Sequence, residues 1–164
     1  MPVIRIDFDD AQINASLARL VALGRDMSPV MRNIAALGEA STRLRFRTET
    51  GPDGKKWKPS LRAQIAGGRT LTKEGHLGDS ISSYAGADFA TWGVNRPYAA
   101  IHQFGGVIKP KSGMALRFRL ASGQFVTVKQ VTMPARPYLG IDDDDRSSIL
   151  ALLQTRISEA AHAG

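Results

Sequence analysis

The sequence contains no cysteine and no long apolar run, and both absences limit what the protein can be. Without cysteine there is neither a disulfide framework nor a thiolate metal site, and an oxidising compartment is not indicated. A membrane helix needs about 20 consecutive apolar residues, and the N-terminus lacks the charged and apolar regions of a signal peptide. We therefore expect a soluble, unsecreted protein that is made in the cytoplasm and has no membrane partner.

Recognisable catalytic, nucleotide-binding and metal-binding patterns are also missing. No Gly-x-Ser-x-Gly elbow surrounds Ser80 or Ser112, and the three histidines of the chain have no metal-ligand spacing. The glycine-containing turns at 51–54 and 67–70 lack the Gly-Lys-Ser/Thr ending of a phosphate loop. These observations predict a protein that is not an enzyme and that holds no cofactor or metal, and a small hydrolase is the least favoured class.

Positive charge is concentrated in the middle of the chain. The net charge is +7, and residues 43–76 contribute nine basic against three acidic residues, which is +6 of that total. A local excess of this kind indicates a polyanionic partner, either nucleic acid or an acidic protein face. A solvated, mobile loop is the alternative explanation for the same composition.

The first part of the chain has the periodicity of one strand and two helices. Residues 3–8 alternate as a half-buried strand does, and a helix capped by an aspartate follows and ends near Gly24. A longer helix begins at Ser28, has Pro29 at its first position and carries an apolar stripe from Met31 to Leu44. One apolar face of this helix is expected to lie against a sheet.

Residues 48–75 have no periodicity and are rich in Gly, Pro and Lys. A structureless stretch of this length is unusual in a compact domain, where such loops are commonly functional or disordered. Trp57 gains little unless its ring is buried. We therefore interpret residues 48–75 as a flexible arm that becomes ordered on a partner.

The second half of the chain predicts short strands and two more helices. Strands are expected at 82–84, 89–94, 115–120 and 125–131, with a short helical turn at 77–81, a hairpin turn at 122–123 and a helix at 98–104. Four aspartates at 142–145 suit the start of a final helix better than a calcium site, because they lack calcium-hand spacing and interact favourably with the helix dipole. The sum is one α+β domain over residues 1–164, with a mostly antiparallel sheet packed against long helices.

Four segments together resemble a known family. They are Gly51–Pro59, Leu71–Ile81, Tyr98–Gly106 and Pro134–Gly140. In this order and spacing they are similar to the virion morphogenesis family of tailed bacteriophages, which includes tail-completion and neck proteins of Mu-like phages. The resemblance runs from about Met31 to Leu153.

This resemblance implies a tail-terminator-like or neck-like fold and a structural role in tail completion or head–tail joining. It implies a homo-oligomeric ring, expected to be a hexamer, that contacts neck, connector or tail-tube proteins. The ring would lie at the neck or tail end of the virion after assembly in the bacterial host cytoplasm. The competing class is a stand-alone, non-specific nucleic-acid-binding protein, which the pI of about 10.1 favours.

The resemblance and the charge pattern together suggest three sets of residues. Residues expected at a subunit or partner interface are Trp57, Pro59, Leu61, Arg136 and Tyr138. Residues expected to contact DNA in a channel are Arg43, Arg45, Arg47, Lys55 and Lys56. Residues expected to pack as a structural motif are Tyr98, His102, Phe104 and Gly105, with a side-chain hydrogen bond from the histidine. The three alternating arginines spread charge around a helix, which weakens any groove-reading model.

Overall fold

The computed structural model describes residues 11–162, and the strand expected over residues 3–8 lies outside this range. The helices are α1 (Ala11–Arg25), α2 (Ser28–Thr48), α3 (Leu61–Ala66), α4 (His76–Asp79), α5 (Ala99–Phe104) and α6 (Asp143–His162). The strands are β1 (Ile81–Ala85), β2 (Ala90–Val94), β3 (Gly106–Ile108), β4 (Leu116–Arg119), β5 (Phe125–Val128) and β6 (Val131–Met133). Helices and antiparallel strand pairs in one chain confirm the predicted α+β class.

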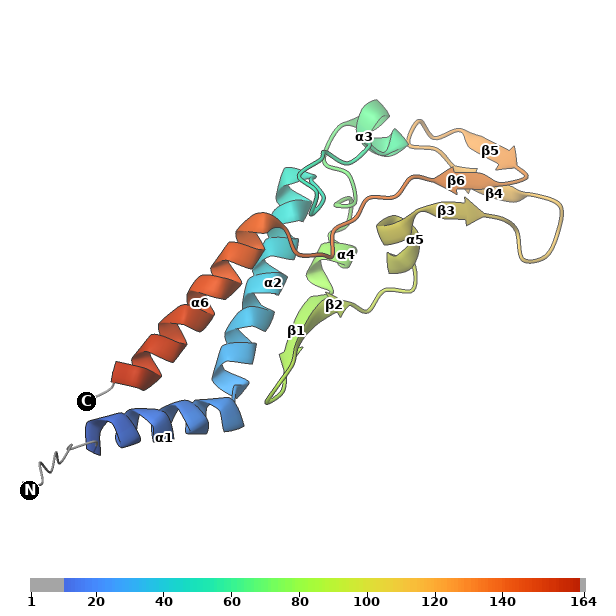
Figure 1. Ribbon diagram of the computed structural model, residues 1–164. Coiled ribbons are helices and arrows are strands. Elements are labelled where there is room, and N and C mark those ends of the chain that lie inside the picture. The colour runs from blue at the N-terminus through green and yellow to red at the C-terminus, as the bar shows by residue number, and fades with distance from the viewer. Residues whose placement is uncertain (1–10, 163–164) are drawn as a thin grey trace, which may run out of the picture.

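The three long helices pack together at one end of the molecule. Helices α2 and α6 run side by side, and α1 crosses the C-terminal end of α6 (Figure 1). Ser16 Oγ donates a hydrogen bond to the carbonyl of Ala161 at 2.8 Å, and Arg19 Nε donates to the carbonyl of Ala160 at 2.9 Å. Carbonyls in the last turn of a helix have no partner within it, so α1 satisfies the end of α6.

Helix α2 packs against the β1–β2 hairpin, as its apolar face predicted. The contact depends on Gly38, because a Cβ at this position would lie 2.4 Å from ring carbons of Trp92 on β2. Any larger residue at this position would require the Trp92 ring, or the hairpin that carries it, to shift. The helix ends at Glu49, whose φ of 55° is left-handed.

The strands of residues 11–162 are antiparallel, as predicted, but they form three separate two-stranded ladders and not one continuous sheet. The pairs are β1–β2, β3–β6 and β4–β5. The strand expected over 125–131 ends at Val128, where β5 pairs with β4, and its last residue, Val131, begins β6, which pairs with β3. Only β1–β2 lies on α2, whereas the other two ladders extend away beyond α5 (Figure 1).

An aromatic cluster forms the centre of the core. The ring of Phe46 lies 5.5 Å from the ring of Trp57 and 5.2 Å from that of Tyr138, measured between centroids. Trp57 is 5% exposed, and its Nε1 donates to the carbonyl of Pro137 at 2.8 Å. Thr70 is also buried, and its N–H bonds to the Glu49 carboxylate. Residues 48–75 therefore fold onto their own chain in this structure, unlike the arm that the sequence suggested.

Two segments that the sequence analysis singled out separately form one hydrogen-bonded unit. The Gln103 side-chain oxygen accepts from the N–H groups of Tyr138 and Leu139, both at 3.0 Å, and its nitrogen donates to the carbonyl of Leu139 at 3.0 Å. The Tyr138 hydroxyl donates to the carbonyl of Ala99 at 3.1 Å. Gly105 lets the chains approach closely, since a Cβ there would lie 2.7 Å from the nitrogen of Ala135. No sequence motif pointed to this role of Gln103.

We expect Trp57→Ala to lower the free energy of unfolding by about 3–5 kcal/mol, because truncating a buried tryptophan leaves a cavity. Urea denaturation followed by circular dichroism measures this change. Leu61→Ala in the same segment is the matched control, because Leu61 is 55% exposed and its loss should cost little. A Trp57→Ala variant of wild-type stability that assembles poorly would return Trp57 to an interface role.

Candidate functional site

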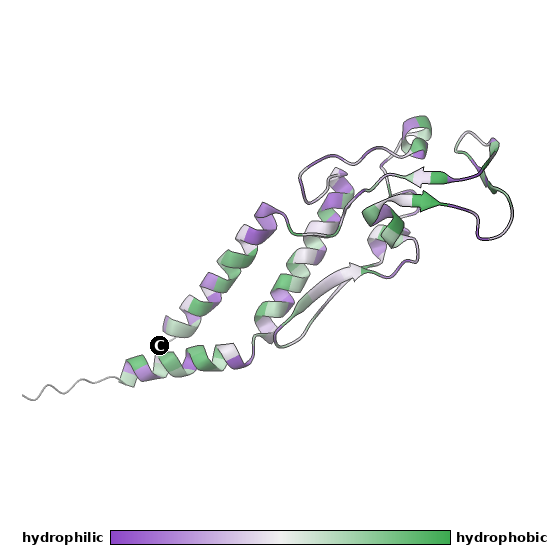
Figure 2. Ribbon diagram, turned by 45° about the vertical axis from the view of Figure 1, so that its right-hand side comes forward, coloured by the Kyte–Doolittle hydropathy of each residue, from purple (hydrophilic) through white to green (hydrophobic). Residues whose placement is uncertain are grey.

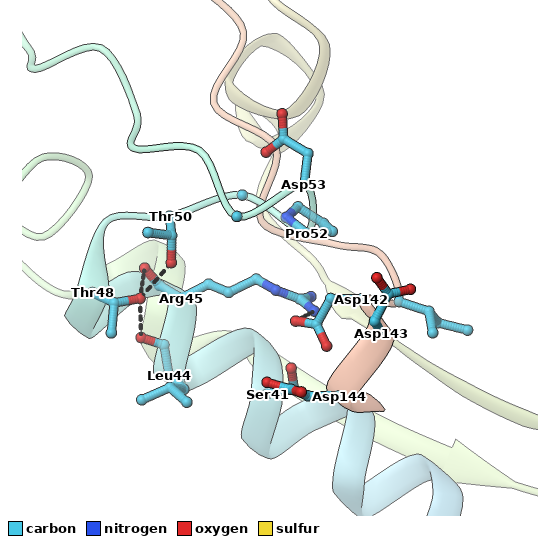
Figure 3. A pocket seen from close by; sticks show the side chains of 13 residues that line it. Ser41, Leu44, Arg45, Thr48, Thr50, Pro52, Asp53, Asp142, Asp143 and Asp144 are labelled. Carbon is cyan, nitrogen blue, oxygen red and sulfur yellow. Dashed lines mark hydrogen bonds and ion pairs between the residues drawn. The ribbon is translucent and has the colours of Figure 1, made fainter. Parts of the chain in front are cut away.

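A groove lies where the end of α2, the turn after it and the start of α6 meet (Figure 3). It has a volume of about 580 Å³ and is lined by some of residues 41–54 and by all of residues 141–144. We call it the acidic groove, because Asp53, Asp142, Asp143 and Asp144 line it and Arg45 is its only basic lining residue. Leu44 and Ile141 add apolar surface and are 49% and 48% exposed.

Arg45 crosses from α2 to the start of α6 and is only 3% exposed. Its Nη2 lies 2.7 Å from Asp142 Oδ2 and 2.5 Å from Asp145 Oδ2, and its Nη1 donates to the carbonyl of Gly140 at 2.9 Å. Figure 3 shows the guanidinium directed at Asp142. Arg45 is therefore occupied inside the subunit, which differs from the channel position that the sequence suggested.

The same two aspartates begin α6 by bonding to each other's backbone. The N–H of Asp142 donates to Asp145 Oδ2 at 3.1 Å, and the N–H of Asp145 donates to Asp142 Oδ1 at 2.8 Å. This reciprocal arrangement is a capping box, which supplies partners for N–H groups at a helix start. The capping interpretation of the acidic run is confirmed.

The charge of Asp142 is coupled to this network. Burial acts to raise the pKa of the Asp142 carboxyl, but the hydrogen bonds from Arg45 and Asp145 and the charge of Arg45 outweigh it and hold the pKa below the ordinary 3.8. The carboxylate is thus ionised in the folded protein at neutral pH, as an ion pair with Arg45 requires.

The expected DNA contacts on α2 lie on two different sides of the helix. Arg43 bonds to Glu39 at 2.9 Å and to the carbonyl of Ile81 at 2.8 Å. Arg43 and Arg47, with Arg69, line a hollow on the α2 face next to β1, whereas Arg45 faces α6. The alternating arginines therefore place their charges on different sides of α2, as helical geometry requires.

The two lysines of the same set make local contacts around the turn after α2. Lys55 Nζ lies 3.5 Å from the Asp53 carboxylate, and Lys56 Nζ donates to the carbonyl of Thr48 at 2.5 Å. Both side chains remain exposed. They are the part of the expected DNA set that is free to meet a partner alongside Arg47.

Most of the residues expected at an interface are internal. Trp57, Arg136 and Tyr138 are 5%, 4% and 0% exposed, and Arg136 Nε donates to the carbonyl of Lys58 at 2.7 Å. Their burial links residues 57–59 to residues 136–138 within one subunit. Only Pro59 and Leu61 of this set lie on the surface.

The expected structural motif is only partly packed. Phe104 is 78% exposed, and the Tyr98 ring is 42% exposed and meets the His102 ring edge-on at 6.0 Å. The expected side-chain hydrogen bond of His102 is absent, because its Nδ1 is buried without a partner. Burial, and secondarily the charge of Arg136, lower the pKa of His102 below the ordinary 6.5. The ring is therefore neutral at pH 7.

A surface that the sequence analysis missed is the stretch from β3 to β6, residues 106–133, which we call the hairpin extension. None of its residues is buried. It carries five basic residues and no acidic residue. Its exposed apolar side chains include Met114 at 93%, Phe125 at 59% and Val107 at 50%. Counting charge over this segment alone would have found it.

Helix α1 presents a second exposed apolar surface. Ile13, Leu17 and Val21 recur every four residues and are 63%, 54% and 54% exposed. Figure 2 shows apolar stretches both on α1 and on strands of the hairpin extension, at opposite ends of the molecule. Apolar surface in more than one place on a single chain is typical of a subunit that binds neighbours.

Residues 11–162 contain neither a membrane-spanning helix nor a metal-binding cluster. No helix in this range combines the length and apolar character that crossing a bilayer demands. Nor does this range bring together three His, Asp or Glu side chains in a way that would hold a metal ion.

Comparison with known proteins gives consistent relatives. The phage virion morphogenesis family matches residues 8–158. The chain is 33% identical over 153 residues to Mu-like prophage FluMu G protein 2 of Haemophilus influenzae, with 93% of this chain and 94% of the relative covered. It is 31% identical over 166 residues to the putative capsid assembly protein G of Escherichia phage Mu, with 96% of each chain covered. No solved structure gives a significant match.

We expect Asp142→Asn to lower the free energy of unfolding at pH 7 by about 1–2 kcal/mol, because it removes a charged partner of Arg45. The folded pKa lies below the unfolded value of 3.8, so the contribution is present above about pH 4 and is lost as the pH falls through the folded pKa. Denaturation of both proteins at several pH values measures the difference. Asp143→Asn is the control, and a pH-independent difference would contradict the ion pair.

We expect acidification to destabilise the protein through His102. Its folded pKa is below 6.5, so the unfolded chain binds more protons there and stability falls as the pH drops below about 6.5. His102→Phe removes the titrating ring and should flatten the pH dependence of the unfolding free energy between about pH 7 and 5. Equal slopes for the two proteins would show that the ring is not held neutral by burial.

Proposed function

Because the chain belongs to the phage virion morphogenesis family, we propose that it is a structural protein of tail completion or head–tail joining that forms a ring. The position proposed is the neck or tail end of the virion, after assembly in the bacterial host cytoplasm. The proposed partners are further copies of the chain, expected as a hexamer, and the neck, connector or tail-tube proteins that adjoin it. The relative from phage Mu is described as a putative capsid assembly protein, which supports an assembly role and not an enzymatic one.

The observation that carries the proposal is the amount of apolar surface left outside the core. The accessible surface is 11,529 Å². A compact monomer of this length would expose only about 8,000 Å². Among residues 11–162, eight hydrophobic residues are buried and eighteen large ones are exposed. A subunit that exposes this much apolar surface is stabilised when neighbouring subunits cover it.

The acid/base side chains support a structural role as well. The buried charges Arg45 and Asp145 are engaged with each other and with the start of α6. Arg136 is engaged with the backbone of residues 58 and 59. Buried charged groups in a cleft often mark catalytic sites, but here their partners are structural contacts that hold segments together. We therefore propose that the protein has no catalytic activity.

Contact with DNA is a second candidate role. The hollow lined by Arg43, Arg47 and Arg69 gathers three cations, although Asp79 lies in it too. In a ring, several copies of this hollow would concentrate positive charge around one duplex, with contacts to phosphate and no dependence on sequence. The stand-alone nucleic-acid-binding protein remains the alternative to the ring.

Light scattering coupled to size exclusion, with native mass spectrometry, tests the proposed function. We expect one closed oligomer whose mass is a small integer multiple of the subunit, and ring-shaped particles in negative stain. A monomer at every concentration that retards a DNA fragment in a gel would favour the alternative. Labelled protein at the neck or tail end of whole virions would support the position, and a label elsewhere would contradict it.

A further inference from the structure

We propose that the hairpin extension of one subunit docks into the acidic groove of a second copy of the chain. This inference rests on the proposed ring and names the two surfaces that build it. The extension is residues 106–133, and the groove is lined by Asp53, Asp142, Asp143 and Asp144 together with Leu44 and Ile141.

Charge complementarity is the first argument. The extension carries five basic residues and no acidic residue. Arg117 is already stacked on the Phe125 ring at 5.0 Å, and Arg119 donates to the carbonyl of Gly123 at 3.0 Å. Lys109, Lys111 and Lys129 are exposed and remain to meet a partner. A surface with one sign of charge steers toward, and aligns with, a surface of the other sign.

The apolar residues make the match specific for a protein surface. Phe118, Phe125 and Met114 are 38%, 59% and 93% exposed on the extension. The groove offers Leu44 and Ile141, which are about half exposed. Protein interfaces combine an apolar centre with a polar rim, whereas phosphate contacts make no use of exposed Met and Phe. The acidic groove therefore suits this extension better than a nucleic acid does.

Geometry requires that the contact join two copies. Every lining residue of the groove comes from residues 41–54 or 141–144, so the extension does not line the groove of its own chain. The extension points away from α2 and α6 (Figure 1). A contact between two different surfaces is head-to-tail, and such contacts close into rings when the rotation between subunits permits.

The test reverses each surface separately. Lys109→Glu, Lys111→Glu and Lys129→Glu change the extension, and Asp143→Lys and Asp144→Lys change the groove. These positions are exposed, and the second pair spares Asp142 and Asp145, which hold Arg45. We expect each variant alone to raise the subunit dissociation constant by about tenfold or more, because like charges then face each other. The affinity of the wild type should fall as salt is added.

Mixing provides the decisive measurement. An extension-reversed subunit and a groove-reversed subunit are complementary to each other at both contacts, so an equimolar mixture should restore the oligomer as an alternating assembly. The control is Arg25→Glu, Arg32→Glu and Lys58→Glu, which makes the same charge change as the extension variant at exposed positions outside both surfaces. This control should assemble as the wild type does.

The possible failures are distinguishable. A wild-type ring that survives the reversed extension overturns this inference and leaves the proposed function standing. The inference is also overturned, and the proposed function left standing, if the mixture does not restore the oligomer. The same holds if the extension-reversed variant loses DNA binding but still assembles. A wild type that stays monomeric at every concentration overturns both the ring and this contact.

Discussion

The rest of the structure depends on the buried charge of Arg45. Its guanidinium joins α2 to the start of α6, and it also holds the backbone of Tyr138 and Gly140. Loss of one partner from a buried ion pair leaves an uncompensated charge, which is strongly destabilising. The helix packing, the cap of α6 and the position of the segment before it are therefore set together by one side chain.

That segment in turn positions the aromatic core. Tyr138 is fully buried between Phe46 of α2 and the backbone of α5, and Pro137 accepts the hydrogen bond of Trp57. Four parts of the chain that are distant in sequence thus meet in space close to Arg45. The core that results is small, and the hairpin extension and α1 are left with exposed apolar side chains. A subunit with this division is suited to assembly, because neighbours can cover what its own core does not.

Local elements were predictable where one short pattern decides the conformation. Ser28 and Pro29 marked the start of α2, the turn at 122–123 lies between β4 and β5, and the aspartates at 142–145 cap α6. Strands of only three residues were harder to predict from the sequence. β3 begins at the second of the two glycines that follow α5, and a glycine pair gives no strand signal. The strand expected over 125–131 ran past the end of β5 to the first residue of β6, because nothing in the sequence shows that the two strands pair with different partners.

The sequence by itself determined the helices other than α3, the turns, the charge balance and, through the order of four segments, the family. Tertiary structure decided which side chains are available. Arg43, Arg45 and Arg47 are equivalent in the sequence, but only Arg45 faces α6 and is buried. Trp57 needed burial, and its partner Pro137 lies 80 residues away. Burial and pairing depend on contacts between distant segments, and local periodicity carries no information about which distant segments meet.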